Sequence, residues 1–377
     1  MTPSNANSPS AGERKTLSDK TCLNSKATGP IRVMIVDDSL TVRIIYRRII
    51  ECDSSLRIDA TASSAEKAII ELKSTSVDVI ILDLEMPGIG GLKGLPEILK
   101  VAGSAQVLVV SSLTDEGAEA TVAALSMGAA DTMLKPRPGA FDEEYRASLI
   151  KKIKVLSNSD ENTSVVGVEA QRNLPTNARA KNAAPPEVLA IGASTGGIHA
   201  INNFLRVLPK EFNLPILVTQ HLPPSFVSVF ARQIETVCGR PTQVGEHGTQ
   251  FLPGSVTIAT GHSHMLIHKI GDRLFARKGT DPVPNGCMPS VDPMLSSLAE
   301  TCGDRVLAII LSGMGRDGLI GAHDVVEAGG TVFAQDADSS AVWGMPGAVA
   351  KAGLASLIAS PDRLSEAAFG LQAAHVY

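Results

Sequence analysis

The sequence predicts an α/β protein of two doubly wound domains, on three observations. Apolar runs of strand length, such as VDVIILDL and VLAIIL, alternate with helical patterns along most of the 377 residues. Continuous apolar runs of this kind are typical of parallel strands buried on both faces. The alternation stops between residues 157 and 186, where Asn, Ser, Pro and Ala predominate, and then resumes. With 44% hydrophobic residues, the chain has enough apolar material for two packed cores.

Composition argues against several classes of protein. A net charge of −5 and a pI near 5.9 provide no basic excess for binding nucleic acid. The five cysteines are odd in number and form no C-x-x-C pair, which argues against a disulfide framework and a zinc site. The polar N-terminus lacks the apolar core of a signal peptide, and no apolar run approaches the roughly 18 residues of a membrane helix. We expect a cytoplasmic protein with reduced thiols and no membrane insertion.

Five predicted β–α units occupy residues 30–156, after a leader of residues 1–29 that is rich in Ser, Asn, Thr and Lys. The leader has little apolar surface to bury, so we expect it to be disordered. Such units build an open parallel sheet of the (βα)5 type. The strand and helix segments are IRVMIVDD with SLTVRIIYRRII, RIDATA with SAEKAIIELK, VDVIILDL with GLKGLPEILK, AQVLVVSS with DEGAEATVAALSMG, and DTMLKP with EEYRASLIKKIKVL.

A second α/β pattern covers residues 187–371, between the linker (157–186) and a short tail (372–377). Its strand-like runs are EVLAIGAS, LPILVTQH, VLAIILSGMG and TVFAQD, with helical patterns between them. Residues 242–280 instead carry short alternating runs with Gly turns, namely SVTIATG, HMLIHKI and RLFARKG. Such runs predict hairpins. The second domain is therefore expected to be a doubly wound sheet with a β-hairpin insertion.

Acidic side chains follow the predicted strands of the first domain. Asp37 and Asp38 end the first strand, and Asp83 ends the third. Any one of them alone is more typical of a helix cap or a solvated turn. Together, at one edge of a parallel sheet, they would repel one another unless a cation joined them, and oxygen ligands suit Mg²⁺. Ser111 and Lys135 end the fourth and fifth strands, where they could bond and pair with a phosphoryl group on Asp83.

The ordered set D-D, D-x-x-M-P, S-S and K-P over residues 31–156 resembles the receiver domain of two-component response regulators. The resemblance implies that a histidine kinase phosphorylates Asp83, that Mg²⁺ bound by Asp38 and Asp83 assists, and that Ser111 takes part in a conformational switch. One departure is Gly90-Gly91, where such receivers usually carry Asp-Gly. Without an N-cap aspartate, the helix that follows is expected to start less firmly.

The segment IGASTGG contains a G-x-S-x-G pattern between Gly192 and Gly196. In α/β-hydrolases this pattern holds a nucleophilic serine on a sharp strand-to-helix turn, which makes Ser194 a candidate nucleophile. A glycine-rich turn before a helix can also cradle a phosphate, because the helix N-terminus offers free N–H groups. A dinucleotide site is disfavoured, because the acidic residue that binds the ribose has no obvious counterpart.

Two further strand ends of the second domain supply a base and a carboxylate. His221 follows LPILVTQ, and Asp317 lies in SGMGRDG after VLAIIL. The ends of parallel strands meet at one edge, so Ser194, His221 and Asp317 are predicted to be the nucleophile, the general base and the group that orients the base. Peptide N–H groups around Met314 are candidate donors to an oxyanion.

Other combinations of residues are weaker candidates. The usual α/β-hydrolase order could be built from Ser194, Asp292 and His323, but His323 falls inside the helical pattern GLIGAHDVVEAG instead of a loop. His199 lies within the helix that Ser194 opens and is expected to point elsewhere.

Three further histidines, His262, His264 and His268, are close together in the sequence. Strand alternation would place the last two on one face, where a metal site is sterically possible. No Cys or clear carboxylate completes such a site, so we interpret this segment as a hairpin surface near the active site.

Five segments of the second domain resemble the catalytic domain of the chemotaxis protein-glutamate methylesterases, the CheB family. With the receiver and linker before it, the resemblance covers the whole chain after the leader. It implies that Ser194 is the nucleophile, His221 the general base and Asp317 the orienting carboxylate, with Met314 at the oxyanion site and Thr195 beside the nucleophile. The segments are IGASTGG, TQHLPPSFVSVFARQ, MPSVDPMLSSLAE, LSGMGRDGLIGA and AGGTVFAQDADSSAVWGMP.

The same resemblance implies a substrate, partners and a mode of regulation. The substrates would be methyl esters of glutamate side chains on methyl-accepting chemoreceptors, which release methanol, and specific glutamines, which are deamidated. A chemotaxis histidine kinase would be the phosphodonor, Mg²⁺ would serve the receiver, and the esterase reaction would need no cofactor. The receiver would cover the mouth of the site until Asp83 is phosphorylated.

Two other functions stay open from the residues alone: a catalytically silent response regulator that binds a partner, and a small-molecule serine esterase. Two departures from the CheB pattern fall in the predicted insertion. The chain has Glu246-His247-Gly248 where an acidic residue usually precedes Asp-Gly, and Ala259-Thr260-Gly261 where Ala-Pro-Gly is usual. Neither involves the predicted triad, so they would act on loop shape or receptor recognition.

Overall fold

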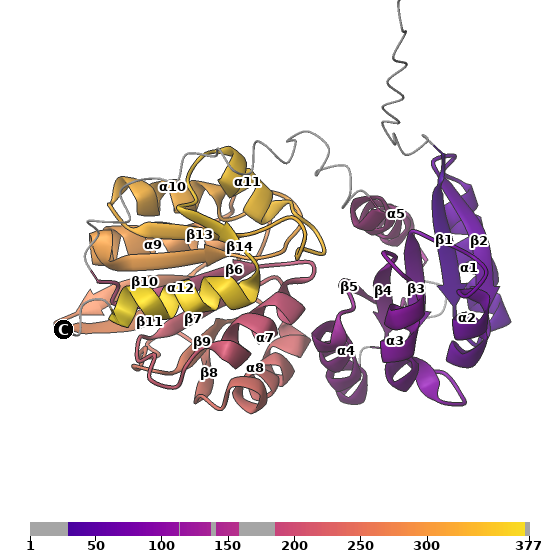
Figure 1. The fold of residues 1–377 in the computed structure, drawn as a ribbon, viewed down its shortest axis with the longest axis horizontal. Coiled ribbons are helices and arrows are strands. Elements are labelled where there is room, and N and C mark those ends of the chain that lie inside the picture. Colours follow the sequence, from indigo (N-terminus) through magenta and orange to yellow (C-terminus); the bar gives the residue numbers. More distant parts are fainter. Residues whose placement is uncertain (1–28, 113, 137–140, 158–184, 374–377) are drawn as a thin grey trace, which may run out of the picture.

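A computed structural model of the chain has two α/β domains, each a central sheet covered by helices (Figure 1). The first domain is drawn in indigo to purple and the second in magenta to yellow. Most of the predicted leader and linker, and part of the predicted tail, lie outside the described residues. The structure describes residues 29–112, 114–136, 141–157 and 185–373.

The first domain has five parallel strands in the order β2-β1-β3-β4-β5, which confirms the predicted (βα)5 sheet. Every residue of β3 is buried, which explains its uninterrupted apolar run. The elements are β1 (Ile31–Val36), α1 (Leu40–Glu51), β2 (Leu56–Ala62), α2 (Ala65–Glu71), β3 (Val79–Asp83), α3 (Gly90–Val101), β4 (Gln106–Ser111), α4 (Asp115–Met127), β5 (Asp131–Leu134) and α5 (Glu143–Ser157).

The second domain has seven parallel strands in the order β14-β13-β12-β6-β7-β9-β8 and a separate antiparallel pair, β10-β11. The chain leaves β6 for β7 on one side and later returns to β12 on the other, so the carboxyl ends of these three buried strands are neighbours. Such switch points are where α/β sheets place their sites. The strands are β6 (Val188–Ala193), β7 (Ile216–Gln220), β8 (Thr242–Gly245), β9 (Val256–Ala259), β10 (His264–Ile270), β11 (Arg273–Gly279), β12 (Val306–Ile310), β13 (Thr331–Gln335) and β14 (Leu357–Ala359).

Six α-helices and a short 3-10 turn connect and cover these strands among the described residues. They are α7 (Gly197–Val207), α8 (Pro224–Cys238), α9 (Val291–Cys302), η3 (Gly303–Arg305), α10 (Leu319–Glu327), α11 (Met345–Lys351) and α12 (Pro361–Ala373).

The prediction of hairpins throughout residues 242–280 is correct for β10-β11 and wrong for the rest. β8 and β9 pair in parallel with each other, and β9 continues the main sheet beside β7. The segment between β8 and β9 bonds instead to the hairpin, where Phe251 N–H donates to Leu274 O at 2.9 Å and Gly248 N–H to Ala276 O at 2.8 Å. The segment between β8 and β9 is thus the crossover connection of two parallel strands. Such a connection is usually a helix, whereas this one is irregular and bonds to the β10-β11 hairpin.

Gly90-Gly91 starts α3 against the backbone of β3. The N-cap residue, Ile89, makes no side-chain capping bond, as expected without an aspartate. A Cβ on Gly91 would lie 2.0 Å from Asp83 O, so only glycine fits there. The Gly91 N–H donates to Leu84 O at 3.1 Å. The start of α3 is therefore held by close backbone contact beside Asp83.

The two domains meet where α4 of the first packs against α7 and α8 of the second (Figure 1). Gln233 donates a hydrogen bond to Ser126 Oγ, and His199 Nδ1 lies 2.9 Å from Ser126 O. Arg232 and Glu119 form an ion pair at 3.1 Å, but both side chains are more than 60% exposed, so the pair contributes at most about 1 kcal/mol. Helix packing and the partly buried Gln233–Ser126 hydrogen bond are therefore expected to stabilise this contact more than the ion pair does.

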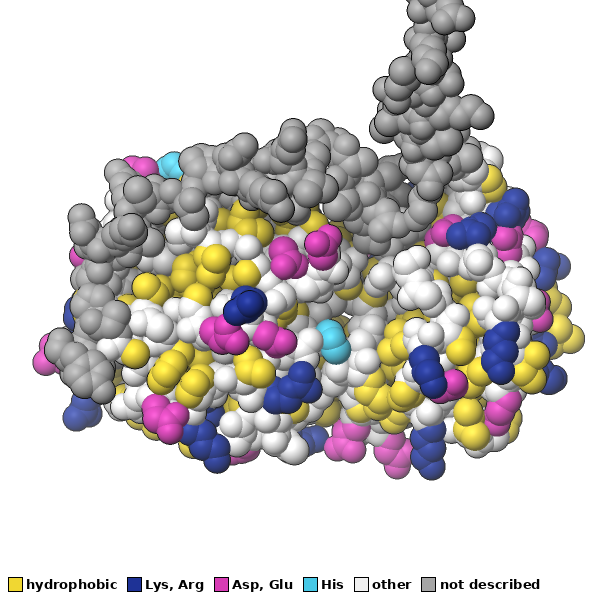
Figure 2. Space-filling view, in the orientation of Figure 1, with side chains coloured by type: hydrophobic (Ala, Val, Ile, Leu, Met, Phe, Trp, Pro, Cys, Tyr) yellow, Lys and Arg dark blue, Asp and Glu magenta, His cyan; other side chains and the backbone are white. Residues whose placement is uncertain are grey.

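Acidic and basic side chains are interspersed over both domains on the face drawn in Figure 2. This mixed surface agrees with a modest net charge of −5. None of the helices described is long and apolar enough to cross a bilayer.

Candidate active site

Ser194 lies on a sharp turn between β6 and α7. Gly196 in this turn has a φ of +75°, and a Cβ there would be 2.5 Å from the Ala341 side chain, so glycine is required. Neighbouring strands hold the serine backbone: its N–H donates to Ser312 O at 3.0 Å, and its carbonyl accepts from Gln220 Nε2 at 2.9 Å. The turn therefore presents the hydroxyl at the carboxyl edge of the sheet.

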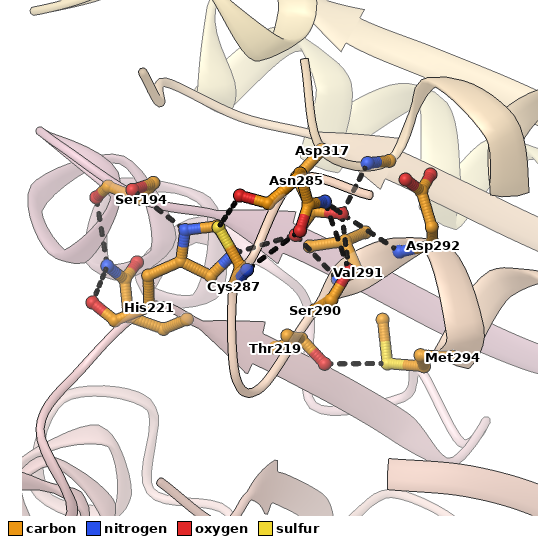
Figure 3. Close-up of polar contacts among 12 residues, drawn as sticks. Ser194, Thr219, His221, Asn285, Cys287, Ser290, Val291, Asp292, Met294 and Asp317 are labelled. Carbon is orange, nitrogen blue, oxygen red and sulfur yellow. Dashed lines mark hydrogen bonds and ion pairs between the residues drawn. The ribbon is translucent and has the colours of Figure 1, made fainter. Parts of the chain in front are cut away.

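His221 follows β7 directly and bridges Ser194 and Asp317 (Figure 3). Its Nδ1 lies 3.1 Å from Ser194 Oγ, and its Nε2 lies 2.7 Å from Asp317 Oδ2. These separations are within hydrogen-bond reach on both sides of the ring. The structure thus brings together the three residues predicted from separate strand ends.

Asp317 is buried, and its carboxylate accepts several hydrogen bonds besides that of His221. Oδ1 accepts from Asn285 Nδ2 at 2.8 Å and Ser290 Oγ at 2.7 Å, and Oδ2 accepts from Val291 N–H at 2.7 Å. Val291 is the first residue of α9, so the helix N-terminus adds a favourable dipole. These donors compensate the cost of burying the charge and fix its direction toward the imidazole.

The pKa values of His221 and Asp317 shift in opposite directions. Burial alone lowers the pKa of His221, but the hydrogen bond to Asp317, with a smaller contribution from Cys287, raises it overall to about 9. Burial alone raises the pKa of Asp317, but the bonds from His221, Ser290 and Val291 lower it well below its ordinary value. The pair is therefore stabilised as imidazolium and carboxylate.

A pocket of about 350 Å³ opens beside Ser194 and is lined by both domains. Met314 and His221 line it from the second domain, and Asp131 and Lys152 from the first. A Cβ on Gly313, the neighbour of Met314, would be 3.0 Å from Ser194 Cβ, so this loop passes close to the hydroxyl. The predicted role of Met314 at an oxyanion site stays a prediction.

The first domain contacts the residues that follow Ser194. Thr195 Oγ1 donates to Asp131 Oδ2 at 2.9 Å, and Gly196 N–H donates to Ala130 O at 2.6 Å. Lys152 Nζ also bonds to Asp131 Oδ2, at 2.6 Å. Polar groups beside Ser194 are thus hydrogen-bonded to β5 and its flanking residue.

Sequence reasoning missed the residues of the loop before α9. Asn285 and Ser290 hold Asp317, and the Cys287 thiol lies within 4.8 Å of the ligand atoms of His221 and Asp317. The segment MPSVDPMLSSLAE, which contains Ser290, resembles the CheB family, but the resemblance assigned no role to Ser290.

His264 supports this loop through both of its ring nitrogens. Its Nδ1 accepts from Ser290 N–H at 3.0 Å, and its Nε2 donates to Asp281 O at 3.0 Å. Both ring nitrogens are therefore engaged in holding the loop before α9.

The alternative residues for a hydrolase lie apart from Ser194. Asp292 Oδ1 accepts from Gly321 N–H at 2.9 Å, whereas His323 on α10 is mostly exposed and lies beside Asp324. His199 is in the first turn of α7 and faces Ser126 across the domain contact. Neither histidine is placed to act as a base for Ser194.

The predicted acidic cluster of the first domain is also assembled. Asp37, Asp38 and Asp83 each offer a carboxylate oxygen within 4.8 Å of the others. Lys135 Nζ lies 2.5 Å from Asp83 Oδ2. Burial raises the pKa of Asp83 to about 6, although the Lys135 bond opposes this shift. The cluster thus combines buried negative charge with one cation.

Ser111 connects this edge of the sheet to α4. It is buried at the end of β4, and its Oγ lies 2.5 Å from Thr121 Oγ1 of α4. α4 is also the helix that packs on the second domain. A change in the hydrogen bonding of the Ser111 hydroxyl would therefore act on α4, a helix of the domain contact.

Comparisons with known proteins agree with this architecture. Family models match residues 189–368 (CheB methylesterase) and 33–143 (response regulator receiver domain). The protein-glutamate methylesterase/protein-glutamine glutaminase 1 of Paramagnetospirillum magneticum is 37% identical over 89% of this chain and 94% of that protein. The corresponding protein of Azospirillum brasilense is 38% identical over 87% and 89%. The crystal structure of the Thermotoga maritima CheB methylesterase catalytic domain is 33% identical, covering 50% of this chain and 100% of that one, at a TM-score of 0.48. The chain therefore belongs to the CheB family of protein-glutamate methylesterases/protein-glutamine glutaminases, with a response-regulator receiver domain before the catalytic domain.

Proposed function

We propose that the chain is a phosphorylation-activated esterase that removes methyl groups from glutamate side chains of methyl-accepting chemoreceptors and deamidates specific receptor glutamines. The observation that carries the proposal is the contact of His221 with both Ser194 Oγ and Asp317. A silent regulator would not need this assembled set. We place the protein in the cytoplasm, because the receptor domain that it would act on and the kinase that would phosphorylate it are cytoplasmic.

The reaction is acyl transfer. His221 Nδ1, 3.1 Å from Ser194 Oγ, takes the hydroxyl proton as the oxygen attacks the ester carbonyl. Asp317 stabilises the imidazolium that forms. The tetrahedral oxyanion would be held by peptide N–H groups in the turn after Ser194 and around Met314. His221 then gives the proton to the departing methoxide, methanol leaves, and water resolves the acyl-enzyme by the same steps. Methanol departs more easily than ammonia, so ester cleavage should be faster than deamidation.

The receiver domain would restrain this reaction through the contacts of Thr195 and Gly196. The Ala130 carbonyl accepts from the Gly196 N–H, two residues after the nucleophile. A receptor segment that docks against this turn would have to displace the Ala130–Asp131 segment. Phosphorylation of Asp83 by a chemotaxis histidine kinase would favour an open arrangement, with Ser111 and α4 carrying the change to α7 and α8.

The receiver residues fit Mg²⁺ as an aid to phosphorylation. Asp37 Oδ2 is buried and has no hydrogen-bond partner, and it belongs to the cluster of three carboxylates. Asp37, Asp38 and Asp83 would hold the ion, which would neutralise the incoming phosphoryl group. Lys135 would pair with the phosphorylated product, and the esterase reaction itself would use no cofactor.

Methanol release from chemoreceptor membranes tests the proposal. The full chain, with Mg²⁺ and a small phosphodonor, should release methanol from membranes whose receptors are methylated. Ser194→Ala should reduce release to the background of membranes alone, and Ser74→Ala, an exposed serine of the receiver, should not. Equal release by wild type and Ser194→Ala would contradict the proposal.

The same assay separates the two kinds of hydrolase. His221→Ala should abolish release, whereas His323→Ala should keep it. The reverse result would favour a small-molecule hydrolase with the common chain order.

A further inference from the structure

Three different metal ligands converge beside the nucleophile. His221, Cys287 and Asp317 offer a ring nitrogen, a thiol and a carboxylate oxygen that all lie within 4.8 Å of one another. Figure 3 shows Cys287 beside the His221 ring, on the loop that leads into α9. The residues are far apart in sequence, which is why the cysteine spacing did not predict a zinc site.

A ring nitrogen, a thiolate and a carboxylate oxygen together favour a borderline-soft divalent cation. Zn²⁺ binds nitrogen, thiolate and carboxylate ligands at about 2.0 to 2.3 Å in tetrahedral geometry, which places the donors about 3.3 to 3.8 Å apart. The three donors lie within 4.8 Å of one another, so no pair has to approach by more than about 1.5 Å to reach this geometry. His221 Nε2 and Asp317 Oδ2, which lie 2.7 Å apart, would instead separate by about 0.6 Å if both bound the ion. Mg²⁺ prefers oxygen ligands, so it would bind the cluster of Asp37, Asp38 and Asp83 in the receiver instead.

Asn285 supports two of the three ligands. Its Nδ2 donates to Asp317 Oδ1 at 2.8 Å, and its Oδ1 accepts from the Cys287 N–H at 2.8 Å. Hydrogen-bonded partners of this kind orient metal ligands and raise affinity. The pocket of about 350 Å³ is lined by all four residues and leaves room for a water or the Ser194 hydroxyl as a fourth ligand.

We propose that one Zn²⁺ ion binds reversibly to His221, Cys287 and Asp317 and inhibits the enzyme. On binding, the Cys287 thiol and the His221 imidazolium each lose one proton to solvent, and the ring keeps its other proton. If the metal takes Nε2, that proton must lie on Nδ1, which then donates to Ser194 and cannot accept from it. If the metal binds Nδ1, it occupies the lone pair that would otherwise accept the Ser194 proton. In both cases His221 stops serving as a base.

The binding follows from the geometry alone, whereas the inhibition rests on the proposed esterase function. The two need separate measurements, one of which does not use activity.

Binding is measured by titrating the full chain with Co²⁺, a spectroscopic substitute for Zn²⁺, with excess Mg²⁺ to occupy the receiver carboxylates. Wild type should bind one equivalent with a thiolate-to-cobalt charge-transfer band that Zn²⁺ abolishes. Cys287→Ser should lose the band, and Cys52→Ser, an exposed receiver thiol, should keep it. Thermal unfolding of each variant verifies that it is folded. Absence of the band in wild type, or its persistence in Cys287→Ser, overturns the site.

Inhibition is measured by methanol release at increasing Zn²⁺, each variant relative to its own metal-free rate. Zn²⁺ should inhibit wild type, a chelator should reverse this, and Cys287→Ser should need roughly tenfold more Zn²⁺ or higher. Equal sensitivity of the two proteins overturns the inhibition. If neither wild type nor Cys287→Ser releases methanol in the absence of Zn²⁺, the result contradicts the proposed function instead. The cobalt band then still tests whether the metal site exists.

Discussion

Asp131 of the receiver domain accepts a hydrogen bond from Thr195 Oγ1, the side chain next to Ser194, at 2.9 Å. The same carboxylate oxygen also accepts from Lys152 Nζ at 2.6 Å. The side chain of Asp131 is only 16% exposed, so its bonds are less screened than those of the exposed Arg232–Glu119 pair. Asp131 is therefore a charged receiver residue that bonds directly to the turn carrying Ser194.

Replacing Asp131 should release this restraint. A hydrogen bond to a charged group contributes about 1.5 to 3 kcal/mol, so Asp131→Ala should raise methanol release without phosphodonor by roughly tenfold. Asp59→Ala is the matched control, because Asp59 pairs with Arg57 on β2, at the opposite edge of the receiver sheet. Unchanged basal release by Asp131→Ala would show that this contact does not restrain the enzyme.

Asp317→Asn should lower kcat far more than KM. An amide in place of the carboxylate cannot stabilise an imidazolium, and it would turn an N–H group toward donors such as Val291 N–H or Ser290 Oγ. The expected loss in kcat is on the order of 10³- to 10⁴-fold. Steady-state methanol release measures it, with the exposed Asp338→Asn as control. A loss confined to KM would mean that Asp317 contributes to binding alone.

Three residues of the candidate active site were predictable because they follow strands. Ser194, His221 and Asp317 each come after a buried apolar run, and the ends of parallel strands must share an edge. Asn285 and Cys287 lie in a loop whose sequence has no hydrophobic periodicity. The position of this loop depends on tertiary contacts, such as the hydrogen bond between His264 and Ser290. Sequence periodicity carries no information on such contacts.

The error over β8 and β9 has a related cause. Each strand has only four residues, and no helical pattern separates them, so a hairpin was the expected connection. They pair in parallel, and the segment that crosses over between them bonds to the β10-β11 hairpin. The contact that accompanies this crossover therefore comes from a part of the chain that follows both strands.

Methanol release should depend on pH through His221. The ring must be neutral to accept the Ser194 proton, and its pKa is raised to about 9, so the competent fraction rises as pH approaches 9. We expect kcat/KM to increase about tenfold per pH unit between about pH 6 and 8 and to level off near the pKa. Uncatalysed hydrolysis is subtracted with Ser194→Ala at each pH. A plateau already reached by pH 7 would indicate an ordinary histidine pKa.

Stability should change with the opposite sign over the same range. Because the folded pKa of His221 exceeds its unfolded value, the stabilisation is complete below about pH 6.5 and is lost as pH rises through about 9. Urea unfolding of wild type and His221→Gln isolates this effect. The difference in the free energy of unfolding between them should shrink across this interval, and a difference independent of pH would contradict the shift.

Removal of Asp83 or of Mg²⁺ should abolish regulation and spare basal catalysis. Asp83 is buried beside Lys135 in the receiver, on a different sheet from Ser194, so Asp83→Asn should eliminate the stimulation of methanol release by a small phosphodonor. A chelator added to wild type should do the same, because Mg²⁺ would neutralise the incoming phosphoryl group. Asp59→Asn, the same substitution on β2, should respond to phosphodonor like wild type. Stimulation that survives in Asp83→Asn would assign the phosphoryl group to another residue, whereas loss of basal release would show that Asp83 holds the catalytic domain in its active form.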